Sequence, residues 1–335
     1  MPFVADILQH RSLSIVGMEK NTGKTVCLNY ILRRLNDMHV HVGVTSIGVD
    51  GEQTDAVFAT AKPEITLYRG SHFITSEKHY AARQLVSEIE ATGGVRTALG
   101  VPVLAKVLVG GKVLLSGAAT TRALLGQIAL LSDAGCQVAI VDGALSRLSL
   151  ASPAVTEAMI LATGAAVSSS LPTLVGHTRF LYGLIGLPEV SEALKERLEN
   201  IESGIWAVDK EGEVHSLGVA SVFLIGDQTR ELLRYGRTLF AAGAVSDRLL
   251  QALAASQEGV ELIVKDFTRL FVSRQTYAEF VKRGGGLQVL RRPQLVAVTF
   301  NPFSPQGFML DSKQACTALS EALGVPVYDV KQIER

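Results

Sequence analysis

The sequence predicts an α/β protein, in which a mostly parallel sheet flanked by helices is followed by a second α/β domain. Short β-rich runs alternate along the chain with segments whose apolar residues recur at helical spacing. Hydrophobic residues make up 47% of the chain and charged residues 19%, which is typical of a protein that buries a core. The length of 335 residues is sufficient for two domains.

The first half of the chain predicts strands and helices in alternation. Short apolar runs predict strands, and apolar residues spaced three or four apart predict helices. The predicted strands are residues 12–16, 40–46, 112–116 and 137–141. The predicted helices are residues 25–35, 80–92 and 120–134. Because strands joined through helices run in one direction, we expect a parallel sheet.

The boundary between the two domains is expected near residue 165. Residues 151–187 are rich in Ala, Gly, Ser and Pro, which is typical of a connection. The domains are therefore predicted as residues 1–165 and 166–335, the second being a partner- or ligand-binding domain. It should begin with a hairpin at residues 205–208 and 214–225. Further strands are expected at 238–242, 260–265, 295–300 and 325–329, with helices at 246–255, 274–282 and 312–323.

The strongest functional signal lies between the first predicted strand and the first predicted helix, where residues 17–25 read GMEKNTGKT. A loop that binds phosphate needs backbone N–H groups at a helix N-terminus, a lysine for the terminal phosphates and a hydroxyl for Mg²⁺. Gly23, Lys24 and Thr25 supply these parts, so the segment resembles a Walker A loop. An ordinary strand-to-helix turn is the alternative. The resemblance implies a P-loop NTPase domain whose nucleotide-binding residues are Gly17, Asn21, Thr22, Gly23, Lys24, Thr25 and Val26.

Two aspartates are candidate ligands of Mg²⁺ alongside Thr25. Asp142 follows an apolar predicted strand and resembles a Walker B aspartate, although it would also suit the cap of a turn. Asp50 follows the second predicted strand, where related ATPases place a switch acid, although an Asp-Gly pair is also a common turn. The expected catalytic residues are Lys24, Asp50, Asp142 and Lys20.

The spacing of the loop narrows the resemblance. Five residues, 18–22, separate the two glycines where the common pattern has four. The longer form resembles the loops of dethiobiotin synthetase, the cobyrinic-acid amidases and other deviant-Walker ATPases, which implies ATP, Mg²⁺ and a homodimer. In dimeric members another lysine, five residues before the loop lysine, reaches the partner's nucleotide. Lys20 precedes Lys24 by only four residues, so a solvated loop lysine is the alternative.

Residues 17–30, 43–52 and 141–147 also resemble P-loop accessory proteins of adenosylcobalamin-dependent lysine and ornithine aminomutases. This resemblance implies a reactivating or chaperone-like switch ATPase that serves a metabolic enzyme. The alternative is an ATP-dependent carboxylate ligase resembling dethiobiotin synthetase. Such enzymes have a lysine–proline pair after the second strand, and here the comparable pair, Lys62–Pro63, is displaced along the chain. The residues do not distinguish ATP from GTP, and the resemblance favours ATP.

Several other polar positions are weaker candidates. Arg147 is expected to contact either a phosphate group or an acidic group in an ion pair at the surface. Residues 116–121 either present backbone N–H donors to a ligand or contain the residue that caps a helix, Thr120. Polar residues that end strands of the second half would form a second cleft, with turn formation as the alternative. These residues are Gly243, Asp266, Asn301 and Asp329.

Composition excludes several classes of protein. The 32 Lys and Arg residues balance 32 Asp and Glu residues, so no nucleic-acid partner is expected. The three cysteines are far apart and predict neither a disulfide framework nor a zinc site, which favours a reducing cytoplasm. No long apolar run and no secretory signal is evident, so we expect no membrane association.

Overall fold

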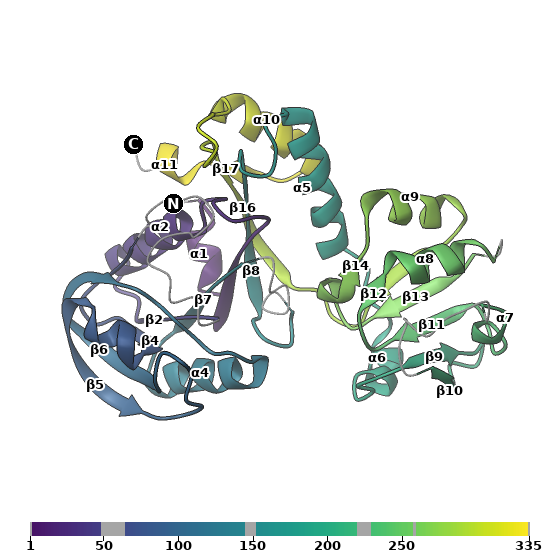
Figure 1. The fold of residues 1–335 in the computed structure, drawn as a ribbon, viewed down its shortest axis with the longest axis horizontal. Coiled ribbons are helices and arrows are strands. Elements are labelled where there is room, and N and C mark those ends of the chain that lie inside the picture. The colour runs from purple at the N-terminus through teal and green to yellow at the C-terminus, as the bar shows by residue number, and fades with distance from the viewer. Residues whose placement is uncertain (1, 48–63, 145–151, 220–228, 257–258, 334–335) are drawn as a thin grey trace. The chain divides into compact units, whose positions relative to one another are not determined.

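The structure, a computed structural model, describes residues 2–47, 64–144, 152–219, 229–256 and 259–333. The chain divides into two compact units (Figure 1). Unit 1 contains Met1–Arg179 and Pro293–Arg335, and unit 2 contains Phe180–Arg292. The C-terminal residues thus return to unit 1, whereas the sequence analysis assigned every residue after 165 to the second domain.

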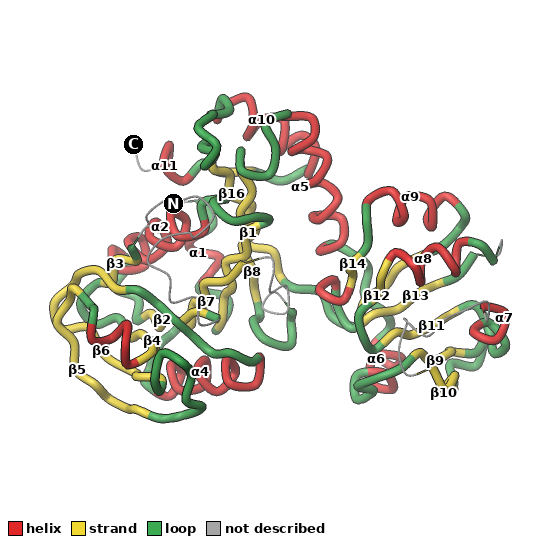
Figure 2. Tube along the Cα trace, in the orientation of Figure 1, coloured by secondary structure: helices red, strands yellow, loops and turns green. Residues whose placement is uncertain are grey.

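A large, mostly parallel mixed sheet forms the centre of unit 1 (Figure 2). Its strands are β1 (Ser12–Gly17), β2 (Val42–Ser46), β3 (Ile65–Leu67), β4 (His72–Ser76), β5 (Gln84–Thr92), β6 (Pro102–Val113), β7 (Val138–Ala144), β8 (Ala158–Gly164), β16 (Gln294–Asn301) and β17 (Val327–Tyr328). The strand order is β17-β16-β8-β1-β7-β2-β4-β6-β3, with β5 paired to β6. Neighbours from β17 to β4 are parallel, and the pairs made by β6 are antiparallel. The predicted α/β class is therefore confirmed.

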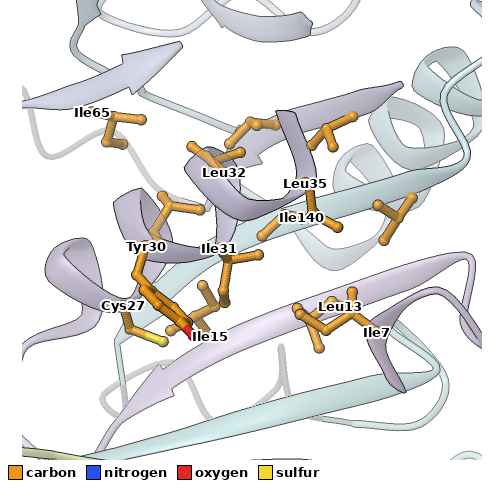
Figure 3. Packing of buried hydrophobic residues seen from close by; sticks show 14 of the residues in the cluster. Ile7, Leu13, Ile15, Cys27, Tyr30, Ile31, Leu32, Leu35, Ile65 and Ile140 are labelled. Atoms are coloured by element: carbon orange, nitrogen blue, oxygen red, sulfur yellow. The ribbon is translucent and has the colours of Figure 1, made fainter. Parts of the chain in front are cut away.

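Helices pack against this sheet. They are α1 (Val4–Ile7), α2 (Lys24–Asp37), α3 (Glu77–Ala81), α4 (Thr121–Asp133), α5 (Leu171–Ile185), α10 (Ser312–Leu323) and α11 (Val330–Ile333). The apolar face of α2 lies over β1 and β7 (Figure 3). The contacting side chains include Cys27, Ile31 and Leu35 from the helix and Ile15 and Ile140 from the strands. No helix in the described ranges is long and apolar enough to cross a membrane.

The helix predicted for residues 80–92 is wrong. This segment contains the end of α3 and then β5, which pairs antiparallel with β6. The apolar positions that suggested a helix are partly exposed, with Val86 at 54% and Ile89 at 48%. The long strand β6 supplies the backbone hydrogen-bond partners of β5. Residues 84–92 therefore form a strand paired with β6 and not a helix with one buried face. The strand predicted at 112–116 overlaps only the end of β6, and the expected connection at 151–187 contains all of β8 and α5.

Unit 2 has its own smaller sheet, ordered β10-β9-β11-β13-β15. The strands are β9 (Ile205–Val208), β10 (Val214–Val219), β11 (Thr238–Ala241), β13 (Glu261–Val264) and β15 (Gly286–Val289). The predicted hairpin is confirmed for β9 and β10, and β11, β13 and β15 are parallel. The remaining elements are α6 (Glu192–Leu198), α7 (Thr229–Leu232), α8 (Asp247–Ala254), α9 (Arg274–Lys282), η3 (Phe267–Arg269), β12 (Val245–Ser246) and β14 (Leu270–Phe271).

Close packing of α4 on β2 depends on Gly43. A Cβ at this position would lie 2.8 Å from the Leu131 Cδ2 atom and 3.0 Å from the Cys136 Sγ atom. We expect Gly43→Ala to lower the free energy of unfolding by about 1–3 kcal/mol, because the helix must move outward. Gly126→Ala, in open space on the same helix, should instead raise it by about 0.5–1 kcal/mol. Urea denaturation measures both, and an unchanged Gly43→Ala variant would contradict the close packing.

Candidate functional site

The glycine-rich loop connects the end of β1 to the start of α2. Two of its residues have left-handed backbones: Asn21, at φ +63°, and Gly23, at φ +88°. Gly23 is the N-cap residue of α2, so the chain turns sharply just before the helix begins. The first N–H groups of a helix have no partner within the helix, and the helix dipole adds positive potential there. The end of β1 therefore faces a site that is suited to an anion.

Lys24 folds back over this loop. Its Nζ donates a hydrogen bond to the Glu19 carbonyl oxygen at 3.2 Å, and Thr22 Oγ1 donates to the same oxygen at 3.0 Å. A Cβ on Gly17 would lie only 2.8 Å from the Lys24 Nζ atom. Gly17 is therefore the residue that leaves space for the ammonium group. The result is a cation held at the N-terminus of a helix, which is what recognition of a polyphosphate requires.

Strand β7 brings Asp142 to the same edge of the sheet. In the strand register Asp142 lies between Ile15 of β1 and Ser46 of β2. Helix α2, whose first turn contains Cys27, packs on β7, the strand that carries Asp142. Burial raises the pKa of the Cys27 thiol to about 12; a hydrogen bond with Thr299 opposes this shift, and the negative charge of Asp142 adds to it.

Asn301, at the end of β16, holds the loop from the other side. Its Nδ2 donates to the Asn21 carbonyl oxygen at 2.8 Å and to the Phe303 carbonyl oxygen at 3.2 Å. A Cβ on Gly23 would lie 2.9 Å from the Cβ of Asn301, so the two residues pack closely. Asn301 therefore belongs to the loop site. Of the four residues expected to form a second cleft, Gly243 and Asp266 lie in unit 2, and Asn301 and Asp329 lie in unit 1.

Two further elements fix the first residue of the loop. The Met18 N–H donates to the Ala162 carbonyl oxygen of β8 at 2.9 Å. The hydroxyl of Thr178, on α5, donates to the Met18 Sδ atom at 3.4 Å and lies 3.0 Å from the Thr163 hydroxyl of β8. These side chains are buried. The loop thus contacts segments that are more than a hundred residues away in the sequence.

The structure brings most of the predicted site residues together. The loop and the first turn of α2 contain Gly17, Asn21, Thr22, Gly23, Lys24, Thr25 and Val26, with Asp142 on the neighbouring strand. Lys20 is exposed on the same loop. Asp50 and Arg147 lie outside the described residues. Across the described ranges no group of three or more His, Cys, Asp or Glu residues is arranged to hold a metal ion.

Residues 116–121 form structural contacts. Ser116 Oγ donates to Ser76 Oγ at 2.7 Å, and both residues are buried. Thr120 Oγ1 accepts a hydrogen bond from the Ala123 N–H at 3.2 Å, which confirms the helix-capping alternative for this residue. A Cβ on Gly117 would overlap the Ser46 carbonyl oxygen, so the chain requires glycine at this point.

Comparison of the chain with protein-family models, curated proteins and solved structures finds no match. The functional interpretation therefore depends on the chemistry of the glycine-rich loop and its neighbours. Of these neighbours, Asn301 was the one that sequence reasoning misplaced. The signal was an Asn-Pro pair at the carboxyl end of a predicted strand, and its sheet could not be assigned without the strand order.

Asn301→Ala tests whether β16 holds the loop. The variant removes the hydrogen bond to Asn21 and retains the Cβ that packs on Gly23, so the fold should be kept. We expect the amides of residues 18–25 to exchange about fivefold faster, which corresponds to about 1 kcal/mol of lost local stability. Hydrogen–deuterium exchange measures this change.

Asn29→Ala is the matched control, because Asn29 bridges α2 to Glu64 and Thr66 and leaves the loop contacts intact. Loop exchange that is the same in the Asn301→Ala variant as in the wild type would show that the β16 contact does not restrain the loop.

Proposed function

We propose that this chain is a Mg²⁺-dependent P-loop ATPase that acts as an accessory or switch protein. The observation that supports this best is the position of Lys24, which is folded over Gly17 at the N-terminus of a fourteen-residue helix. A lysine at that place meets the terminal phosphates of a nucleotide while the helix N-terminus meets the others.

Each residue of the site has a role in this proposal. Lys24 holds the β- and γ-phosphates, and the loop amides at residues 21–25 orient them. Thr25 and Asp142 supply a hydroxyl and a carboxylate, the hard oxygen ligands that Mg²⁺ accepts alongside phosphate and water. Mg²⁺ held there would neutralise negative charge on the phosphate oxygens. Asp50 is the proposed switch acid.

The contacts of the loop support a switch. Met18 touches Thr178 on α5, and the boundary between the two units falls within this helix, after Arg179. A helix transmits a shift at one end along its length better than a loop does, because its backbone is hydrogen-bonded throughout. A change at the loop on ATP binding therefore has a physical route to unit 2.

The partner in this proposal is a metabolic enzyme, with an adenosylcobalamin-dependent aminomutase as the candidate that the sequence resemblance suggests. A homodimer is part of the same proposal, with Lys20 as the residue that reaches the partner's nucleotide. ATP is preferred to GTP on the same resemblance. The alternative function is a carboxylate ligase. Lys62–Pro63, the displaced pair that is comparable to the substrate-binding pair of such enzymes, lies outside the described residues.

Hydrolysis of ATP by the purified protein tests the roles of Lys24, Asp142 and Asp50. Lys24→Ala should reduce Mg²⁺-dependent ATP hydrolysis by about a hundredfold or more, because charge on the terminal phosphate loses its main stabilising group. Asp142→Asn should weaken the dependence of the rate on Mg²⁺ more than Asp50→Asn does. Lys313→Ala, which removes an exposed lysine on α10, is the control. Unchanged turnover in a folded Lys24→Ala variant would refute the assignment of the loop.

The second prediction distinguishes the switch from the ligase. Hydrolysis of ATP and GTP is measured alone, with an adenosylcobalamin-dependent aminomutase, and with a series of small carboxylates plus ammonia. A switch ATPase should hydrolyse ATP slowly by itself and faster with the aminomutase. Lys24→Ala should abolish hydrolysis both with and without the aminomutase. A rate that ignores the enzyme and rises only with a carboxylate would replace the switch by the ligase.

A further inference from the structure

Helix α4 has one face that is packed and one that is not. Its inner face buries Leu124, Gln127 and Leu131, and Gln127 Oε1 accepts a hydrogen bond from Thr45 Oγ1 of β2 at 2.9 Å. This contact fixes the rotation of the helix on the sheet. The opposite face, here named the outer face of α4, is exposed to solvent. We define it by six exposed residues, Arg122, Leu125, Gly126, Ala129, Leu130 and Asp133, and Thr121 and Ser132 are also exposed beside them.

The outer face of α4 is apolar along its middle. The side chains of Leu125 and Leu130 are 42% and 46% exposed, so two large apolar side chains of this helix face solvent. Between them lie Gly126 and Ala129, and a Cβ at Gly126 would have no heavy atom of this chain within 4 Å. Two leucines therefore flank a shallow centre that a second helix can approach closely.

The outer face is also symmetric about its midpoint. Three pairs of residues lie at equal distances in sequence from the bond between Gln127 and Ile128, and the members of each pair are similar in size or opposite in charge. The pairs are Gly126 and Ala129, Leu125 and Leu130, and Arg122 and Asp133. If a second copy of the helix lies antiparallel on this face, leucine meets leucine, small residues meet at the centre, and a positive charge meets a negative charge at both ends. Self-complementarity of this kind is the requirement for a twofold interface.

The two charges are placed against the preference of an isolated helix. Acidic residues favour the first turn and basic residues the last, because the helix dipole is positive at its N-terminus. In α4 the first turn carries Arg122 and the last turn carries Asp133. Beside an antiparallel partner, each charge lies next to the oppositely charged end of the other helix. The arrangement that is unfavourable in one helix is thus favourable in the pair.

We propose that the outer face of α4 is a homodimer interface, in which the α4 helices of two chains pack antiparallel. The proposal does not depend on nucleotide binding. A helix of 13 residues is only about 20 Å long, so one helix pair buries less than the roughly 1,200 Å² of a standard stable interface. The dimer should therefore be weak and form reversibly with concentration.

Sedimentation equilibrium of the full chain without nucleotide, over a wide range of concentrations, tests the interface. The wild type should show a reversible monomer–dimer equilibrium. Arg122→Asp and Asp133→Arg each place like charges opposite one another twice, so each should weaken dimerisation by about tenfold or more. Val281→Glu adds a charge at a similarly exposed apolar position on α9, 45% exposed, and should leave the equilibrium unchanged.

Restoration of the dimer is the decisive result. The double variant Arg122→Asp/Asp133→Arg restores both ion pairs, so its dimer should be stronger than that of either single variant. It should be weaker than the wild-type dimer, because each charge then lies beside the like-charged end of the partner helix. Mixing the two single variants should give a heterodimer, because their charges then oppose correctly. A chain that stays monomeric at every concentration would overturn the proposal. So would a dimer that the single charge reversals do not weaken, or one that the double variant fails to restore.

Discussion

The position of β1 is the constraint on which the rest of unit 1 depends. All six of its residues are buried, and it lies between two parallel neighbours, β7 and β8. A strand covered on both faces and paired on both edges cannot shift its register without exposing a whole row of apolar side chains. The carboxyl end of β1 is therefore fixed. The chain leaves the sheet at Gly17, and α2 packs back over the strand that precedes it.

Strain at this exit is compatible with a stable fold because the neighbouring elements restrain the loop. Left-handed Asn21 costs free energy that an unrestrained loop would release by changing conformation. Here the Asn21 carbonyl oxygen accepts from Asn301, and the Met18 N–H donates to Ala162. The restraint comes from β8 and β16, so the shape of the loop depends on strands that enter the sheet much later in the chain. A loop that already has the shape its ligand requires loses less entropy when the ligand binds.

Sequence reasoning succeeded where the signal was local and failed where it was not. The helix from residue 24 and the strands around Ile15 and Ile140 follow from apolar spacing within a dozen residues. The segment at 84–92 carries the same kind of spacing, yet pairs with β6, a partner that no local pattern reveals. The prediction that placed Asn301 in the second domain was wrong for the same reason. The type of Asn301 and its place at a strand end were evident, but its neighbour across the sheet was set by the order β16-β8-β1.

The glycine-rich loop contacts both of the elements through which the chain enters and leaves unit 2. Unit 2 is inserted between Arg179, within α5, and Pro293, just before β16. Thr178, which contacts the loop, lies next to the first boundary, and Asn301, which also contacts the loop, lies at the far end of the strand that follows the second. Coupling between two binding equilibria is reciprocal. If a ligand at the loop and a partner on unit 2 are coupled through α5 or β16, each must change the affinity of the other by the same factor.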